Sequence, residues 1–345
     1  MSRLAEQAYL RTRLAIMREN LIEADRLAEL AAMPYDELAT ESGFDEFDGS
    51  GSPGQRLAAF ERAQLQSWLD ELSALLRPLE GSGRRLLTQW ASRYELLNIK
   101  ALVRGKIGQL PNDEIERSLY LLPGFLNLNI EELLNTDNVR DLLRQLQNTR
   151  YRRIATQALR RYEENPDPFL LDATLDQQFY VELIDRAGQL DSGDRNEILD
   201  LIGRIVDRHN LVWSLRYRFN YFLQPSEVLY LAIDGGRVLN RTRLQRVVNE
   251  ESLAEACAQL PAHLLPDDAD TSSITQLDVA LKHDIERYAM RVLRVSPSVL
   301  TSALAYLVLR HGDIMSLYAI VHARVHGLAD EVLLASLDQL HGVHG

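Results

Sequence analysis

Apolar residues recur at the three- and four-residue spacing of a helix along almost the whole chain. Between residues 4 and 30 this spacing suggests one long first helix with charges on its opposite face. The same pattern predicts helices at residues 57–72, 85–110, 130–162, 175–190, 193–222, 243–259, 274–293 and 297–325. β-like alternation is scarce, and the 11 prolines fall between segments, where proline starts or ends a helix. The sequence therefore predicts an all-α fold.

Two stretches interrupt the helical pattern. Residues 42–54 and 261–273 are rich in Gly, Ser, Pro and acidic residues, so we expect loops there, the first of them flexible. Neither contains the Gly-x-x-x-x-Gly-Lys-Ser/Thr pattern of a phosphate-binding loop, and the chain has only three lysines. Direct nucleotide binding is therefore not expected.

Three segments, 95–110, 207–222 and 313–328, align without gaps. Each opens with an acid, carries a small polar residue three positions later, and has a base eleven positions after the acid. The second copy lies 112 residues after the first, and the third 106 residues after the second, so three copies nearly fill the chain. Gly124 follows Asn98 of the first copy by the same number of residues as Gly236 follows Asn210 of the second. We therefore predict three homologous helical domains, at residues 1–128, 129–240 and 241–345.

The polar positions of these three signatures are candidate functional residues. Residues two apart on a helix point to different faces, whereas residues three apart share a face. The simpler interpretation is that the polar groups tie each helix to its neighbours through hydrogen bonds and ion pairs. The alternative, not exclusive of the first, is that three helices related by approximate three-fold pseudosymmetry line one polar surface. The residues concerned are the acids Glu95, Asp207 and Asp313, the polar residues Asn98, Asn210 and Ser316, the bases Arg104, Arg216 and His322, and the bases Lys106, Arg218 and Arg324.

Charge and composition narrow the function. Acidic residues outnumber basic ones 50 to 38, which disfavours nucleic-acid binding because phosphate contacts supply much of that affinity. The N-terminal residues are too charged for a signal peptide, and no stretch approaches the ~18 uninterrupted apolar residues of a spanning helix. We expect a protein that is soluble or lies on a membrane without crossing it.

The sequence gives only weak signals for catalytic or metal-binding sites. The single cysteine, Cys257, excludes an intrachain disulfide and multi-cysteine metal sites, fits a reducing compartment, and is expected to be a small buried residue. His322 and His326 have a helical metal-ligand spacing but lack the intervening Glu, so an exposed helix face is expected. The acids at 267, 268 and 270 lie in a loop, and His341 and His344 in a tail expected to be disordered. No catalytic, cofactor-binding or metal site is predicted, which favours a structural or coupling role.

The signature residues resemble a known family. The run from Tyr94 through Glu95 and Asn98 to Arg104 and Lys106 looks like the d subunit of V-type and A-type rotary ATPases, called the C subunit in many bacterial and archaeal complexes. Further agreement, in the family's order, covers nearly the whole chain. It comprises an opening helix with Tyr9, Arg13, Met17 and Leu21, the segment Leu175 to Tyr180, the second signature, Gly235-Gly236, and a closing segment from Tyr306 to Leu328. Departures are Ser316 and His322, where the family tends to have Asn and a base, and the acidic loop at 42–54.

The resemblance implies a non-catalytic rotor subunit. It implies three similar helical domains arranged as a funnel on the cytoplasmic face of the ring of proteolipid c subunits, peripheral to the membrane, with the membrane stator subunit nearby. The polar centre of the funnel would receive the foot of the central stalk, made of the D and F subunits, and pass torque to the ring. We expect Arg104, Lys106, Arg216, Arg218 and Arg324 to contribute to this socket, with Asn98, Asn210 and Ser316 beside them.

Two other function classes stay open at this point. One is an all-α protein–protein scaffold unrelated to rotary ATPases, which would bind some other partner. The other is an α-helical enzyme with an unrecognised site, which a pocket with converging carboxylates would favour.

Overall fold

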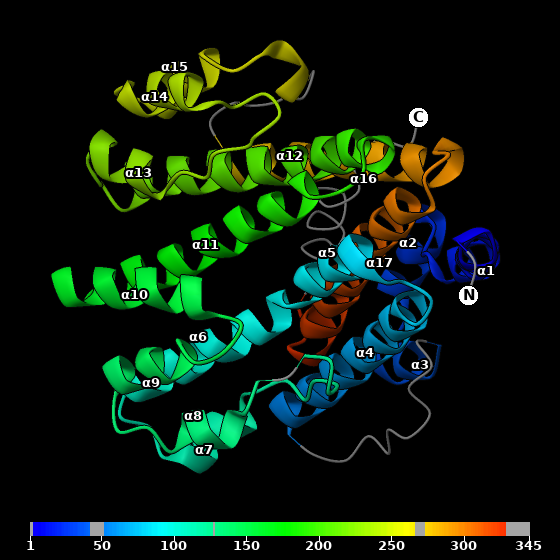
Figure 1. Ribbon diagram of the computed structural model, residues 1–345, viewed down its shortest axis with the longest axis horizontal. Coiled ribbons are helices and arrows are strands. Elements are labelled where there is room, and N and C mark those ends of the chain that lie inside the picture. The colour runs from blue at the N-terminus through cyan, green and yellow to red at the C-terminus, as the bar shows by residue number, and fades with distance from the viewer. Residues whose placement is uncertain (1–2, 42–51, 127, 266–272, 329–345) are drawn as a thin grey trace.

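The structure, a computed structural model, describes residues 3–41, 52–126, 128–265 and 273–328 (Figure 1). All regular secondary structure in these ranges is helical, which confirms the all-α prediction. The tail with His341 and His344 and the acids Asp267, Asp268 and Asp270 lie outside the described residues. So do most of the loop at 42–54 and the second half of the loop at 261–273.

Long helices that follow one another in the chain form three hairpins. Proline stands at the first or second position of α4 and of α11, and Ser52 and Gln55 form a capping box in front of α4, so the sequence specifies where these helices begin. The first hairpin is α4 Pro53–Leu76, α5 Gly81–Ala91 and α6 Arg93–Ile107; the second is α11 Pro168–Gly188 and α12 Ser192–Leu215, prolonged by the π-helical turn η2 Arg216–Asn220; the third is α16 Ile274–Val295 and α17 Val299–Val325.

Shorter helices precede and connect the hairpins. Those before the first hairpin are α1 Arg3–Met17, η1 Arg18–Asn20, α2 Ala24–Ala32 and α3 Tyr35–Glu41. Those between the first and second are α7 Asn112–Arg117, α8 Ile130–Leu134, α9 Val139–Leu146 and α10 Arg152–Glu164; those between the second and third are α13 Pro225–Leu231, α14 Arg241–Asn249, α15 Leu253–Ala258 and η3 Ala262–Leu264.

Four of the expected helices are interrupted: residues 85–110 divide into α5 and α6, residues 243–259 divide into α14 and α15, and two further helices break elsewhere. The expected first helix ends at η1, because the backbone is extended at Leu21 and Glu23 and the amide of Ile22 is donated to Asp313 on α17. The expected helix at 130–162 is α8, α9 and α10, because Asn138 caps a new helix with its side chain. These last two breaks are made by hydrogen bonds that apolar spacing does not register.

The hairpins pack in cyclic order. Helix α11 lies against α5 and α6, α16 lies against α12, and α17 returns to lie against α4 of the first hairpin (Figure 1). Each hairpin therefore contacts the next, and the third contacts the first. The three-fold pseudosymmetry, the funnel shape and the boundaries at residues 128 and 240 remain predictions.

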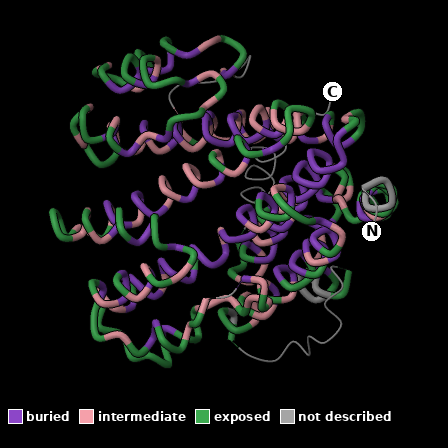
Figure 2. Tube along the Cα trace, in the orientation of Figure 1, coloured by how far each residue is buried: buried purple, intermediate pink, exposed green. Residues whose placement is uncertain are grey.

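Helix α17 is the most buried element. Figure 2 shows buried positions concentrated along α17 and the helices around it, and exposed positions on outer helices such as α7 and α13. By length and composition α17 could cross a membrane, but 67% of its apolar window is buried inside the protein. Its apolar residues pack on those of α1, α4, α12 and α16 in the main core. In this structure α17 therefore serves as a core helix.

Candidate functional site

The three signature acids, Glu95, Asp207 and Asp313, each hold a segment outside their own helix. Glu95 is fully buried, accepts the Tyr151 hydroxyl at 2.5 Å and pairs with Arg150, just before α10. Asp207 is 2% exposed, and its two oxygens each accept a backbone amide at 2.8 Å, from Val238 and Leu239. Asp313 accepts one amide, from Ile22, at 3.2 Å. The same position therefore fastens a different part of the chain in each copy.

The small polar residues make two kinds of contact: each asparagine clamps one backbone residue, binding both its carbonyl and its amide, whereas the serine bonds within its own helix. Asn98 donates to the carbonyl of Tyr120 at 2.9 Å and accepts its amide at 2.8 Å. Asn210 does the same to Ile233, at 2.8 and 2.9 Å. Both asparagines are almost fully buried, so each replaces the water that this stretch of backbone would otherwise bind. Ser316, also buried, donates instead to the carbonyl of Gly312 in its own helix, at 3.0 Å.

The first signature base of each copy faces the leading helix of the next hairpin. Arg104 pairs with Asp172 on α11, with Nε 3.1 Å from the carboxylate. Arg216 lies 3.9 Å from Asp278 on α16. His322 lowers the pKa of Glu61 on α4, although burial is the larger effect and raises that pKa overall. The two ion pairs and this electrostatic interaction follow the cyclic packing order of the hairpins.

The second signature base caps a short helix with a hydrogen bond to its last turn. Lys106 donates to the carbonyl of Leu134 in α8 at 2.6 Å, and Arg218 to that of Val248 in α14 at 3.0 Å. Arg324 donates to the carbonyl of Ala31 in α2. A cation at a helix C-terminus satisfies an unpaired carbonyl and complements the helix dipole.

The signature helices also end alike. In each copy a leucine amide (Leu110, Leu223 or Leu328) donates back to a carbonyl of the last turn at 2.9 Å. The residue before that leucine has a positive φ: Gln109 at 53°, Phe222 at 57° and Gly327 at 65°. This is the left-handed helix stop, which only glycine adopts without strain. Phe222 is strained and 76% exposed.

One residue is inserted in the second copy. The π-helical turn η2 absorbs it, so the clamped residue lies 22 positions after Asn98 but 23 after Asn210. The pairing of Gly124 with Gly236 is therefore wrong by one position. The two sites also differ in space: a side chain at Gly236 would collide with Asp207, whereas one at Gly124 would meet nothing.

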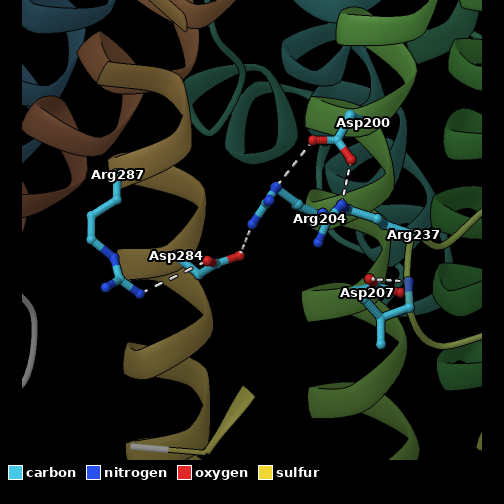
Figure 3. Close-up of polar contacts among 7 residues, drawn as sticks. Asp200, Arg204, Asp207, Arg237, Asp284 and Arg287 are labelled. Atoms are coloured by element: carbon cyan, nitrogen blue, oxygen red, sulfur yellow. Dashed lines mark hydrogen bonds and ion pairs between the residues drawn. The ribbon is translucent and has the colours of Figure 1, made fainter. Parts of the chain in front are cut away.

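An ion-pair network braces the second hairpin against the third (Figure 3). Arg204 on α12 binds Asp200 on its own helix and Asp284 on α16. Arg237, in the segment that Asp207 holds, binds the other oxygen of Asp200. This network joins the clamped segment, α12 and α16 in one connected set of polar contacts.

Cations gather where the helices α6, α12, α16 and α17 meet. Burial lowers the pKa of His311 to about 3, and Arg93, Arg208 and Lys282 lower it further. Burial likewise lowers the pKa of His209 to about 3, with Lys100 and Arg208 adding to the effect. Both histidines are therefore neutral near pH 7, and His311 is held at Nδ1 by the hydroxyl of Tyr94, 3.1 Å away.

Most of the predicted site residues act within the fold. Asn98, Asn210 and Ser316 are buried, and Lys106, Arg218 and Arg324 cap helices, as the simpler interpretation of the signatures expects. Arg104, with a 64% exposed side chain, and Arg216, at 33%, keep surface that a partner could reach. Cys257 is buried, as predicted, and His322 and His326 are exposed with their rings 4.4 Å apart.

Sequence reasoning missed two exposed apolar residues. Leu97, just before Asn98, is 42% exposed, and Met315, just before Ser316, is 47% exposed. They occupy one position of the repeat, on helices that are otherwise largely buried. The signal was available in the alignment, where an apolar residue precedes the small polar residue in both copies, but a helical pattern alone does not separate a core position from an exposed one.

Comparison with known proteins gives one consistent result. The family model described as ATP synthase (C/AC39) subunit matches residues 10–335. Similar curated proteins include the C subunit of the A-type ATP synthase of Methanosarcina mazei, 24% identical over 94% of this chain and 91% of that protein. The corresponding A-type ATP synthase proteins of Halorubrum lacusprofundi (24% identical, 94% and 95% covered) and Halobacterium salinarum (22%, 97% and 98%) are further examples.

Proposed function

Because the chain belongs to the ATP synthase (C/AC39) subunit family, we propose that it is a non-catalytic rotor subunit of a V/A-type ATPase or ATP synthase. In this role it is a socket that joins the D and F subunits of the central stalk to the ring of proteolipid c subunits. It transmits torque between them and so couples ATP chemistry to ion transport. It lies peripherally on the cytoplasmic face of the membrane, near the stator subunit. Its three pseudosymmetric domains, divided near residues 128 and 240, form the funnel.

The observation that carries this proposal is the cyclic bracing of the three hairpins. A part that transmits torque must resist twisting, because each charge that crosses the membrane releases about 2.3 kcal/mol per 100 mV. Contacts such as Arg104 with Asp172 and Arg204 with Asp284 cross from one hairpin to the next. A set of helices braced in a closed order stores less of the applied twist than an open array does.

The use of the signature acids supports a non-catalytic role. A general acid or base needs a carboxyl group that can reach a substrate. Glu95 and Asp207 are instead buried and occupied by hydrogen bonds from their own chain. The chemistry of ATP therefore falls to other subunits.

The exposed parts of the signature helices are the candidate partner contacts. Arg104 and Arg216 present charge, while Leu97 and Met315 present apolar surface at one repeat position. A polar contact with a small apolar centre suits a joint that must hold under load and still be assembled from separate subunits. The remaining signature residues shape the socket by holding its helices.

The test is co-purification from native membranes. The tagged chain is extracted with mild detergent and its partners are identified by mass spectrometry. Recovery of a small apolar proteolipid together with the nucleotide-binding subunits supports the proposal. Recovery of the chain alone or with unrelated proteins contradicts it and favours the scaffold alternative.

The role of Arg104 is tested by charge reversal. Arg104→Glu should weaken association with the stalk subunits at least tenfold while helical content and the melting temperature stay close to wild type. Arg117→Glu is the matched control, because Arg117 is 72% exposed and also pairs with an aspartate, Asp113. Equal affinities for the two variants would remove Arg104 from the interface.

A further inference from the structure

Arg93, the first residue of α6, carries a positive charge that no carboxylate among the described residues pairs with. Its Nε donates to the carbonyl of Trp90 at 3.1 Å, and its guanidinium lies over the Trp90 ring, 3.3 Å from the ring centroid. Its Nη2 is buried and has no hydrogen-bond partner in the part of the chain that the structure describes. Stacking and one hydrogen bond therefore hold the guanidinium in place and leave part of its donor capacity unused.

The groups that act on Arg93 do not supply a negative charge near pH 7. Burial is the largest effect on its pKa and lowers it, because water solvates the cation poorly at this place. The phenols of Tyr180 and Tyr94 oppose this effect only when ionised, and burial raises the pKa of both, so both are neutral near pH 7. A guanidinium stays protonated in proteins. The free chain therefore holds a poorly solvated charge without a counter-charge, which costs stability.

Arg93 lies where the three hairpins meet. Together with Arg208 of α12 and Lys282 of α16 it lowers the pKa of His311 on α17, so each hairpin contributes one cation to this place. Arg208 and Lys282 are each paired with a carboxylate of α16, at 2.6 and 3.5 Å. Only Arg93 of these three cations lacks such a pair, although the net charge of the chain is −12. A partner that brings a carboxylate to this place therefore meets a complementary charge.

Exposed apolar side chains flank this charge. Leu97, which is 42% exposed, lies one turn after Arg93 on the same face of α6. Met315, which is 47% exposed, lies one turn after His311 on the same face of α17. The hydroxyl of Tyr94 lies 3.1 Å from Nδ1 of His311, so α6 and α17 meet at this place. The surface therefore combines a cation that lacks a carboxylate with apolar side chains from two neighbouring helices.

We propose that Arg93 binds a side-chain carboxylate of the central stalk, and that apolar residues beside this carboxylate cover Leu97 and Met315. The inference rests on the proposed function, which assigns the foot of the stalk to the centre of the array. A guanidinium held flat by stacking can bind a carboxylate through two parallel hydrogen bonds. A carboxylate on a protein segment fits this surface better than a small free anion, because a free anion leaves the two apolar side chains in water.

The experiment is calorimetric titration of the full chain with the purified D and F subunits of the same complex. Arg93→Gln should weaken binding by about tenfold or more, because it removes one partner of a charge pair at the interface. Arg287→Gln is the matched control, since Arg287 on α16 is 73% exposed and lies 3.8 Å from a carboxylate of its own helix. Its affinity should equal that of the wild type. Wild-type affinity in Arg93→Gln overturns the proposal.

The melting temperature of the free chain separates binding from a structural role. Arg93→Gln removes a charge without a counter-charge, so its melting temperature should equal or exceed that of the wild type. A lower melting temperature together with unchanged affinity for the stalk subunits means that Arg93 only holds the fold. Arg93→Lys keeps the charge but not the planar fork, so it should bind more tightly than Arg93→Gln and more weakly than the wild type.

Leu97→Ser decides the question should Arg93→Gln fail to fold. It changes an exposed side chain and should weaken binding several-fold, whereas Val295→Ser, at a 69% exposed residue that ends α16, should not. Equal affinities for these two variants overturn the proposal.

The source of the carboxylate is tested with sodium acetate. If acetate raises the melting temperature of the wild type but not of Arg93→Gln, and stalk binding is the same in both, the ligand is a free anion and the proposal is wrong. If the wild-type chain does not bind the stalk subunits at all, the proposed function fails together with this inference. Wild-type binding that Arg93→Gln leaves unchanged overturns this inference alone.

Discussion

The second and third signature helices differ most at the positions where they look most alike. Helix α12 holds its following segment with a carboxylate that accepts two amides and an asparagine that clamps a backbone residue. Helix α17 has a carboxylate with one longer hydrogen bond and a serine that bonds to its own helix. One sequence pattern therefore makes different hydrogen bonds at corresponding positions of the two copies. The comparison shows that the hydrogen bonds made at a repeated position depend on which segment packs against the helix, and not on the residue type alone.

The largest expected effect comes from removing the clamp. Asn210→Ala leaves a buried amide and a buried carbonyl of Ile233 without partners, and should lower the free energy of unfolding by about 2–4 kcal/mol. Ser316→Ala should lower it less, by about 1–2 kcal/mol, because the hydroxyl donation to Gly312 is lost while that carbonyl keeps its place in the helix. Urea unfolding followed by circular dichroism measures both. Equal losses would mean that the two positions hold the fold equally.

The next largest effect is a difference in stability between the Asp207→Asn and Asp313→Asn variants. Asp207→Asn should cost about 1–3 kcal/mol, because an amide offers one acceptor oxygen where Val238 and Leu239 need two. Asp313→Asn leaves its single hydrogen bond intact. Unfolding at pH 5, where Asp313 is largely protonated in the folded protein, isolates this contrast. A similar loss in both variants would contradict the assigned partners.

The pH dependence of stability gives the sign of the Asp313 contribution. Its pKa is about 7 in the folded protein against an ordinary value of 3.8, so the folded state binds the proton more tightly. Stability from this group is therefore complete below about pH 4 and is lost as pH rises toward 7. At pH 8, Asp313→Asn should be more stable than wild type by about 1–2 kcal/mol, and thermal melts from pH 4 to 8 should show a flatter profile. A less stable variant at pH 8 would reverse this assignment.

The two bases of the first signature, Arg104 and Lys106, should contribute differently to the free energy of unfolding. Lys106→Met removes the hydrogen bond to the last turn of α8 and should cost about 1 kcal/mol. Arg104→Met removes an ion pair whose arginine is 64% exposed, and should cost about 0.5 kcal/mol or less. Denaturant midpoints at 0.1 and 1 M salt distinguish the two, since only the exposed pair is screened. A larger loss for Arg104 would shift its role from partner contact to stability.

Much of the fold could be predicted because the helices are determined by patterns of neighbouring residues. Apolar spacing predicted the long helices, although α4 and α11 begin at Pro53 and Pro168, earlier than the predicted residues 57 and 175. The signature residues Asn98 and Asn210 were found from their recurrence, and the interpretation that they tie their helices to neighbours agrees with their contacts.

What could not be predicted depends on contacts between distant parts of the chain. The segment that carries α2 contacts α17 through Ile22 and Ala31, much as the segment that carries α14 contacts α12 and η2 through Leu239 and Val248. An alignment of the second and third copies does not reveal this, because α2 precedes the third signature by about 290 residues and has different side chains. The π-helical turn at η2 hid a one-residue insertion, which displaced the comparison of Gly124 with Gly236. The exposure of Leu97 and Met315 depends on which faces the neighbouring helices leave uncovered.

The smallest expected effect concerns the ends of the two helices. Phe222 holds a φ of 57° at the end of the second signature helix, where the third has Gly327. Phe222→Gly relieves this strain at a site where the aromatic ring is 76% exposed, and the relief exceeds the added entropy of the unfolded chain. We expect a gain of about 0.5 kcal/mol in the free energy of unfolding, measured by urea titration. Gln109→Gly, at the same position of the first signature helix, should shift stability in the same direction. A loss of stability in Phe222→Gly would mean that the ring itself holds the end of α12, and the second copy would then differ from the third by a packing contact and not by strain.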